Sequence, residues 1–212
     1  MVSVDSSFDT PPASTESVPL PVKIVVAGGY AVGKTTFVGS ISEIDPLTTE
    51  AALTTVSAAV DDEGDASTKT STTVAMDFGT YQLPEEGISL LLFGTPGQPR
   101  FRFMTNILKG DVDVVAFVVD AEARQTHAAA GVELRSLLSD LRVPAVIAVN
   151  RCSDQETAER VARSLGALAG EPVVPCQLIS PASGRHVIVE ILLTLLDALD
   201  LSLIHISEPT RR

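Results

Sequence analysis

The chain has 212 residues, 45% of them hydrophobic, and its 27 acidic against 15 basic residues give a formal net charge of −12 at pH 7. This length and apolar content fit one globular domain with a tail, and the acidic balance argues against nucleic acid or an anionic membrane surface as partner. No stretch approaches the roughly 20 apolar residues of a membrane span, and no basic region followed by an apolar block marks a signal peptide. We therefore expect a cytoplasmic protein.

The first part of the chain separates into a tail, a strand, a helix and a loop. Residues 1–20 are rich in Ser, Thr, Pro and Asp and have little to bury, so we expect a disordered tail. Val22 to Ala27 is a short apolar run with β-branched residues, which predicts a buried strand, and Lys34 to Glu43 predicts a helix. Thr48 to Thr72 is polar, Thr-rich and acidic, which predicts a long exposed loop with room for one helical turn.

The rest of the chain alternates between strand and helix patterns. Two strands, Thr73 to Leu83 and Ile88 to Phe93, flank a turn at Pro84 to Gly87. The later strands are Val112 to Val119, Ala145 to Val149 and Val173 to Val174, and the later helices are Ala128 to Leu141, Gln155 to Leu168 and Gly184 to Leu199. This order predicts an α/β fold with a mostly parallel six-stranded sheet, its second strand antiparallel, and helices on both faces.

The last segment, Leu201 to Arg212, resembles over its whole length a reading-frame translation of a sequencing adapter. We therefore expect residues 201–212 to be a non-native tail and the native C-terminus to be missing.

Four residue positions with redox or metal-binding chemistry form no recognisable site pattern. Cys152 and Cys176 lie far apart without CxxC spacing, so we expect reduced thiols. His127 and His186 lie at or on predicted helices without a carboxylate or cysteine at ligand spacing, so we expect both on the surface.

The strongest motif lies between the first predicted strand and the first predicted helix. Gly28 to Thr35 reads Gly-Gly-Tyr-Ala-Val-Gly-Lys-Thr, which fits the phosphate-loop pattern G-x-x-x-x-G-K-[ST]. Glycines let backbone N–H groups face the phosphate oxygens, the lysine reaches the β- and γ-phosphates, and the threonine hydroxyl is a Mg²⁺ ligand. An ordinary glycine-rich turn would not require the Gly-Lys-Thr triplet in this context. The predicted nucleotide-binding residues here are Gly28, Gly29, Tyr30, Ala31, Val32, Gly33, Lys34, Thr35 and Thr36.

A second segment, Leu90 to Gln98, ends a predicted strand in a glycine turn. Here the sequence resembles the Ras-like small GTPases, whose corresponding segment is Asp-x-x-Gly-Gln. The resemblance implies that the Gly97 amide contacts the γ-phosphate and that Gln98, with Lys34, is catalytic because it orients the attacking water. Gly94 occupies the place of the aspartate that holds Mg²⁺ through water, so metal binding would depend on Thr35, the phosphates and a residue of the preceding loop.

The sequence also resembles a bacterial subgroup, the conservon-type GTP-binding proteins, which are related to bacterial polarity GTPases. The resemblance covers roughly Val22 to Leu199 and rests on Val25 to Gly29, Ser42 to Ile44, Thr72 to Gly79 and Phe93 to Gln98. It implies a G domain over residues 21–200, in which Gly94 is a family trait. It also implies GTP/GDP and Mg²⁺ as ligands, and Roadblock-type and sensor-kinase-like proteins as partners.

In such switches a threonine before the second strand closes over Mg²⁺ when the γ-phosphate is present. The resemblance assigns this role to Thr73, with Thr72 as the alternative. Ordinary solvated turn chemistry remains the other explanation for a Thr-rich loop.

The base-recognition motif departs from the family pattern. Small GTPases read guanine with Asn-Lys-x-Asp, whereas Val149 is followed by Asn-Arg-Cys-Ser-Asp. Asn150 fits, but Ser153 stands where the carboxylate should be, and Asp154 comes one position late. Either Asp154 shifts into place through a local bulge or base selectivity is relaxed. The backbone of Leu178, in the later loop, is the other predicted base contact.

Three functions remain open on this sequence. The leading hypothesis is a GTP-dependent molecular switch with slow intrinsic hydrolysis, whose ordered loops are recognised by a partner. A P-loop ATPase or kinase would need a substrate lid or a second carboxylate near the phosphates. A pseudo-GTPase interaction module is favoured by the missing base-reading aspartate, but Lys34, Thr35 and Gln98 are intact. Three roles are open for Arg100 and Arg102: an internal arginine finger, a contact with a partner, or plain surface charge.

Overall fold

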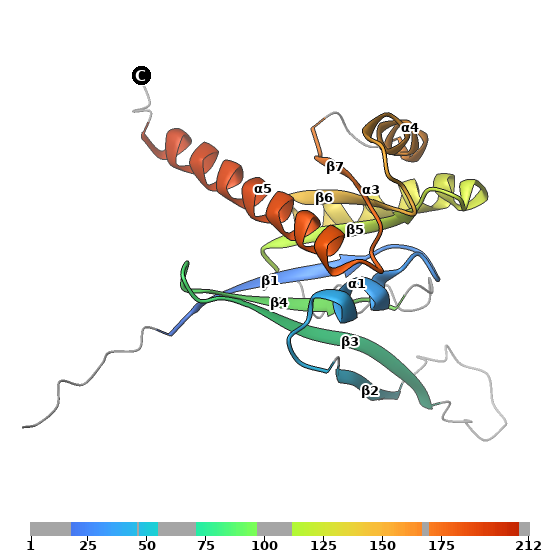
Figure 1. Cartoon of the computed structure of the whole chain (residues 1–212), viewed down its shortest axis with the longest axis horizontal. Coiled ribbons are helices and arrows are strands. Elements are labelled where there is room, and N and C mark those ends of the chain that lie inside the picture. The colour runs from blue at the N-terminus through green and yellow to red at the C-terminus, as the bar shows by residue number, and fades with distance from the viewer. Residues whose placement is uncertain (1–17, 46, 55–70, 97–111, 167–169, 208–212) are drawn as a thin grey trace, which may run out of the picture.

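The computed structural model describes residues 18–45, 47–54, 71–96, 112–166 and 170–207, and side chains are described within 18–45, 76–96, 112–166 and 170–200. The described strands form one seven-stranded sheet with the order β2-β3-β4-β1-β5-β6-β7 (Figure 1). The strands are β1 (Leu20–Ala27), β2 (Leu47–Thr54), β3 (Ser71–Leu83), β4 (Ile88–Gly94), β5 (Val114–Asp120), β6 (Ala145–Asn150) and β7 (Val173–Cys176). The helices are α1 (Lys34–Ile41), the short 3₁₀ helix η2 (Arg124–Thr126), α3 (His127–Leu141), α4 (Gln155–Leu165) and α5 (Pro181–Ser207).

The sheet confirms the predicted doubly wound α/β architecture. β1 pairs in parallel with β4 and β5, and β6 pairs in parallel with β5 and β7. β3 runs antiparallel to both β2 and β4. Among the described strands it is the one that runs against the others, as predicted for the second strand of the six.

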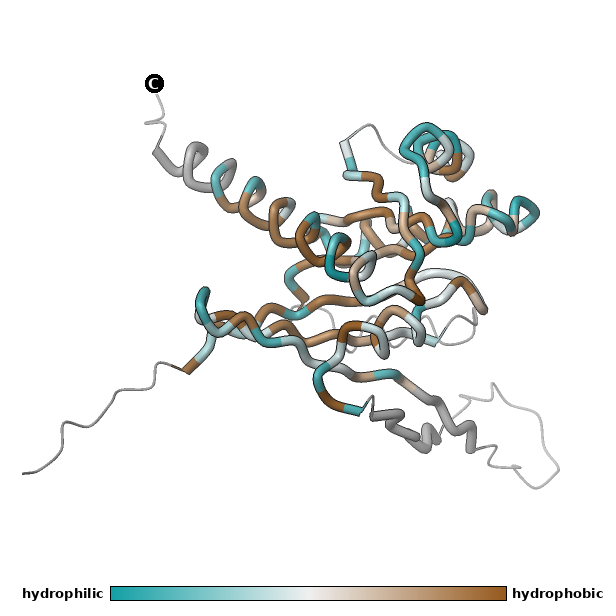
Figure 2. Tube along the Cα trace, viewed as in Figure 1, coloured by the Kyte–Doolittle hydropathy of each residue, from teal (hydrophilic) through white to brown (hydrophobic). Residues whose placement is uncertain are grey.

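The two faces of the sheet bury separate hydrophobic clusters. Along β1, Ile24 and Val26 pack on one face with α1 and α5, and Val25 and Ala27 pack on the other with α3 and α4. This alternation follows from the period of two along a strand. Because both faces are covered, the central strands are continuous apolar runs, and β5 is buried along its whole length. The strands accordingly form the brown centre of the fold in Figure 2, and α4 carries a polar outer side.

One sequence expectation about the loop before β3 is wrong. Residues 48–72 were expected to form an exposed loop, but Leu47–Thr54 forms β2, an edge strand paired with β3 from Thr54↔Ser71 to Leu47↔Phe78. This strand raises the described count to seven, one more than the six predicted. Threonine is β-branched and favours extended backbone, but pairing depends on a partner strand beyond the reach of local composition. Residues 55–70 lie outside the described part of the chain.

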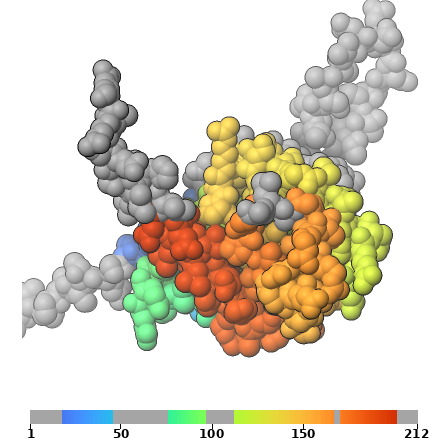
Figure 3. Space-filling model, turned by 90° about the horizontal axis from the view of Figure 1, so that it is seen from above, coloured from blue at the N-terminus to red at the C-terminus, as the bar shows by residue number. Residues whose placement is uncertain are grey.

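The other elements lie within a few residues of their predicted bounds, except the last helix. α5 begins three positions before the predicted Gly184 and continues through Ser207, past the predicted end at Leu199. The proposed non-native segment therefore continues the helix up to Ser207, and residues 208–212 lie outside the described chain. Seen from above, the yellow-to-red C-terminal half of the chain forms most of the visible face (Figure 3).

The parallel strands end at one edge of the sheet. Gly28 follows β1 there, Asp120 and Asn150 close β5 and β6 as Cα partners, and Cys176 ends β7 opposite Asn150. Ligands of doubly wound sheets bind outside this carboxyl edge. None of the helices described here is both long and apolar enough to cross a lipid bilayer.

Candidate functional site

The phosphate loop turns sharply between β1 and α1 because its residues adopt unusual backbone angles. Gly28 has φ 131° and Gly33 has φ 110°, and Ala31, with φ 58°, is a non-glycine residue in the left-handed region. A Cβ atom at Gly28 would lie 2.1 Å from the backbone oxygen of Val118 in β5. A side chain there would collide with the sheet, so the loop can lie close against β5 only with glycine. The loop thus makes a tight turn at the position where the sequence predicts a phosphate cradle.

The side chain of Lys34 lies inside this loop. Its Nζ donates hydrogen bonds to the backbone oxygens of Gly28, at 2.8 Å, and Gly29, at 2.5 Å. Burial lowers the pKa of Lys34, and the nearby carboxylates of Glu133 and Asp77 act in the opposite direction. The ammonium is therefore held at the first turn of α1, where a phosphate would meet both the lysine and the helix N-terminus.

Two carboxylates near Lys34 were not singled out from the sequence. Glu133 lies on α3 and Asp77 on β3, and both act electrostatically on the lysine. Because these positions are far from the Gly-Lys-Thr motif in sequence, no local spacing pattern could link them to the site.

Asp77 contacts the metal-binding residue predicted from the phosphate loop. The Thr35 hydroxyl donates to Asp77 Oδ2 at 2.5 Å. Asp77 is also the Cα partner of Gly94, the residue that stands where the Ras-like pattern has its metal aspartate. A Cβ atom at Gly94 would lie 3.0 Å from Asp77 Cβ and 3.3 Å from Asp77 Oδ2. The Asp77 side chain thus lies beside the position where an aspartate side chain at residue 94 would begin.

The oxygen atoms of Thr35 and Asp77 suit a magnesium ion. Mg²⁺ is a hard cation that is bound by hydroxyl and carboxylate oxygens together with phosphate and water. Both atoms lie at the N-terminal turn of α1, beside the phosphate cradle. The described residues contain no group of three or more His, Cys, Asp or Glu side chains that would hold a metal by themselves. Thr35 and Asp77 are therefore the described side chains that could contribute oxygen atoms to a divalent cation beside the cradle.

Several predicted residues of the γ-phosphate side are not described in full. Gly97, Gln98, Arg100 and Arg102 lie outside the described residues, so their predicted roles remain predictions. The backbone of Thr73 lies in β3, where it pairs with Ala52 of β2. Its side chain is not described. Tyr30 is 79% exposed at the phosphate loop, and Thr36 is exposed in the first turn of α1.

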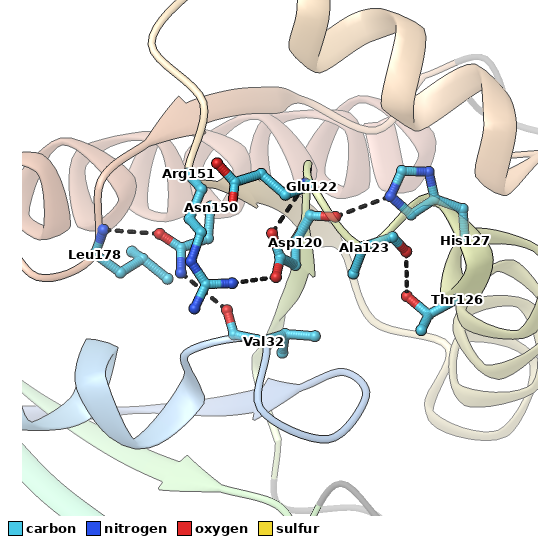
Figure 4. Close-up of polar contacts among 9 residues, drawn as sticks. All are labelled: Val32, Asp120, Glu122, Ala123, Thr126, His127, Asn150, Arg151 and Leu178. Carbon is cyan, nitrogen blue, oxygen red and sulfur yellow. Dashed lines mark hydrogen bonds and ion pairs between the residues drawn. The ribbon is translucent and has the colours of Figure 1, made fainter.

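Asn150 joins three loops at the other end of the site (Figure 4). Its Nδ2 donates to the backbone oxygen of Val32 at 2.9 Å, and its Oδ1 accepts from the Leu178 amide at 3.0 Å. Gly33 also lies close, because a Cβ atom there would be 2.5 Å from Asn150 Nδ2. The prediction that Asn150 and Leu178 belong to one site is consistent with this geometry. The Leu178 amide, however, is already bonded to Asn150.

Asp154, the other predicted base contact, lies at the start of α4. It is the N-cap of α4, and its Oδ1 accepts from the Thr157 amide at 2.7 Å. This hydrogen bond lowers the pKa of Asp154, and the side chain is exposed to solvent. Ser153 is also exposed. The extended backbone of Asp154, with φ −130° and ψ 145°, fits an N-cap position, where Asp is common.

The expectation that His127 lies on the surface is wrong, whereas His186 is exposed as expected. His127 is 5% exposed, and its Nε2 donates to the backbone oxygen of Asp120 at 2.8 Å. Its Nδ1 lies 3.0 Å from Ser164 Oγ on α4. The ring bridges the end of β5 to α4, a long-range contact that helix periodicity does not reveal.

The two cysteines lie together beside the Asn150 turn. Both are free and buried, and the Cys152 amide donates to the Cys176 oxygen at 3.2 Å. Burial, with a smaller contribution from Cys152, raises the pKa of the Cys176 thiol to about 12. Such a thiol is protonated at neutral pH and therefore a poor nucleophile.

The sequence has measurable similarity to known proteins. The profile of a family described as "Conserved hypothetical ATP binding protein" matches residues 26–167, which include the phosphate loop and Asn150. The chain is also 30% identical over 140 residues to an uncharacterized protein of Methanocaldococcus jannaschii, and the match covers 65% of this chain and 76% of that protein.

Proposed function

Because the chain belongs to the family of conserved hypothetical ATP binding proteins, we propose that it is a Mg²⁺-dependent nucleoside triphosphatase that works as a molecular switch. The observation that carries the proposal is the phosphate loop, in which Lys34 is folded into a glycine cradle beside the Thr35–Asp77 pair. GTP is the first candidate nucleotide, because the chain resembles the small GTPases. ATP is the second candidate, and the family description favours it.

The first step is capture of the phosphates. The amides of the loop and of the α1 N-terminus face the phosphate oxygens. Lys34 exchanges its bonds to the Gly28 and Gly29 oxygens for bonds to the β- and γ-phosphates. Because its amine lies in the loop before the ligand arrives, little side-chain ordering is needed on binding.

Mg²⁺, when bound, neutralises charge on the phosphate oxygens. Thr35 would hold the ion through Oγ1. Asp77 would accept a hydrogen bond from Thr35 or from a water bound to the ion, and would so take the role of the aspartate that the Ras-like pattern has at the position of Gly94. This assignment rests on the 2.5 Å contact and on the register that sets Asp77 opposite Gly94.

Hydrolysis depends on Gln98, which follows β4, and switching depends on Thr73 in β3. Gln98 orients the attacking water, and Lys34 stabilises the charge on the leaving phosphate. Thr73 lies on the same strand as Asp77, so closure of Thr73 over Mg²⁺ in the triphosphate state would be transmitted to the edge of the sheet formed by β2 and β3. The partners implied by the resemblance, Roadblock-type and sensor-kinase-like proteins, would recognise this ordered edge.

The direct test is a titration of the purified chain with labelled GTP and labelled ATP, each competed by the other nucleotide, with and without Mg²⁺. The proposal expects Mg²⁺-enhanced binding of at least one of them and slow release of phosphate. Absence of binding to both nucleotides in a folded sample would refute the nucleotide-dependent switch and favour a pseudo-GTPase interaction module. Rapid hydrolysis of ATP without GTP binding would favour an ATPase.

A further inference from the structure

We infer that Asp120 is a positioning residue of the base-binding end, where it holds the Arg151 guanidinium against the purine, so that adenine and guanine are bound with little discrimination. This inference rests on the proposed nucleotide binding and specifies the chemistry of that same site.

The ion pair between Asp120 and Arg151 is the central observation. Arg151 Nη1 donates to Asp120 Oδ2, and the two side chains differ in exposure, at 45% for Arg151 and 10% for Asp120. Asp120 closes β5 and is the Cα partner of Asn150, so the guanidinium lies at the carboxyl edge between two strand ends. Figure 4 shows Arg151 extending from the turn after β6 to the Asp120 carboxylate.

Asp120 itself is fixed from several directions. Its Oδ1 accepts from the Glu122 amide at 3.0 Å, and its backbone oxygen accepts from His127 Nε2 at 2.8 Å. A nearly buried carboxylate with such contacts has little freedom to move. Arg151, in contrast, has a half-exposed side chain, which leaves it accessible to a ligand. Asp120 therefore sets the orientation of the Arg151 side chain.

The remaining groups of this turn do not offer the usual reading of guanine. Both polar groups of the Asn150 side chain are engaged with Val32 and Leu178, and the Asp154 carboxylate caps α4. A guanidinium supplies donors and a flat cationic surface but no acceptor for the N–H groups of guanine. Stacking on such a surface is available to every purine. The chemistry at this end thus supports purine binding without strong choice between the two bases.

The test compares ligands with and without a base. Affinities for Mg²⁺ complexes of GTP, ATP and inorganic tripolyphosphate would be measured for the parent and for Arg151→Ala, Arg151→Lys, Asp120→Asn and the double variant Asp120→Asn/Arg151→Ala. Glu156→Gln is the matched control, because it removes one carboxylate from an exposed ion pair on α4, with Arg160. Thermal melts would confirm that each variant is folded.

The inference expects the parent to bind GTP and ATP within about tenfold of each other. Arg151→Ala and Asp120→Asn should each weaken both nucleotides by about three- to tenfold, the size of a cation–aromatic contact, and leave tripolyphosphate within about twofold. The double variant should be no weaker than Arg151→Ala alone, and Arg151→Lys should retain part of the affinity.

Four outcomes would overturn the inference. An equal loss for tripolyphosphate would make the pair a purely structural contact. Full nucleotide affinity in Asp120→Asn would show that Asp120 does not position Arg151. Independent, additive losses in the double variant would show the same. A loss for GTP far larger than for ATP would mean that Arg151 reads the guanine edge. If the parent binds none of the three ligands, the proposed function itself fails, and this result is distinct from the others.

Discussion

The Thr35 hydroxyl donates a 2.5 Å hydrogen bond to Asp77 Oδ2 and so joins the first turn of α1 to β3. Thr35 belongs to the phosphate loop, and Asp77 is the Cα partner of Gly94, which stands where the Ras-like pattern has its metal aspartate. The contact places a carboxylate beside the loop without one at residue 94. It also connects the proposed metal-binding position to the strand that pairs with the edge strand β2.

Asp77→Asn should weaken the Mg²⁺ dependence of nucleotide binding. The amide keeps the shape of the side chain but loses the charge that supports Thr35 and the metal waters. Loss of an outer-shell partner of a metal typically costs about 10- to 100-fold in metal affinity. Nucleotide affinity would be measured against Mg²⁺ concentration, with Glu86→Gln in the exposed β3–β4 turn as control. Unchanged Mg²⁺ dependence would show that Asp77 does not take part in binding the metal.

A swap of the two positions tests the same relationship from the other side. Gly94→Asp alone should be destabilising, because its side chain begins 3.0 Å from Asp77 Cβ. In an Asp77→Ala background the space is larger, and Gly94→Asp should restore Mg²⁺ dependence lost in Asp77→Ala. The readouts are the melting temperature and the Mg²⁺ titration. If the double variant binds Mg²⁺–nucleotide no better than Asp77→Ala, the carboxylates are not interchangeable.

Lys34→Ala should reduce triphosphate affinity by at least about tenfold, equivalent to about 1.4 kcal/mol. The change removes the ammonium that lies among the loop carbonyls. Arg163→Ala, at an exposed position of α4, is a control for loss of one positive charge. Equilibrium binding of labelled nucleotide checks the effect. Parental affinity in a folded Lys34→Ala variant would show that Gly28 to Thr35 is not the site.

Gln98→Leu should slow hydrolysis while nucleotide binding persists, because leucine cannot orient a water. Single-turnover phosphate release, measured beside equilibrium binding, separates the two effects. An unchanged hydrolysis rate would show that Gln98 does not have this role, and Arg100 and Arg102 would then be the next candidates for stabilising the transition state.

Asp154→Ala should lower the melting temperature and leave the ratio of GTP to ATP affinity within about twofold of the parent. The carboxylate caps α4 through Thr157, and removing an Asp N-cap destabilises a helix. Because the folded chain lowers the pKa of Asp154, its stabilising effect is present near neutral pH and is lost as the pH falls through that lowered value. Loss of a GTP preference in Asp154→Ala would instead indicate that Asp154 contacts the base.

Ser153→Asp should raise the preference for GTP, because it places a carboxylate where the small-GTPase pattern has one. A charged acceptor for two base N–H groups is worth about 1.5 to 3 kcal/mol, or roughly 10- to 100-fold. Competition between GTP and ATP checks this. The same ratio as in the parent would mean that the turn after β6 does not face the base.

The sequence by itself determined the phosphate loop, the α/β order and most of the element bounds. The motif Gly28 to Thr35 is recognisable because the loop is local: its glycines, lysine and threonine lie within eight consecutive positions. The strands were recognisable because a sheet covered on both faces requires continuous apolar runs.

Only the tertiary structure decided which distant side chains meet at the carboxyl edge. Asp77 reaches Thr35 because β3 pairs with β4 in one register, and a shift of one residue would turn the carboxylate to the other face. Asp120 reaches Arg151 through the pairing of β5 with β6, and the buried His127 ring lies between Ser164 of α4 and the Asp120 oxygen at the end of β5. β2 likewise exists because β3 offers it an edge. These contacts join residues far apart in the chain, so their geometry is fixed by strand register and helix packing, and no local residue pattern encodes them.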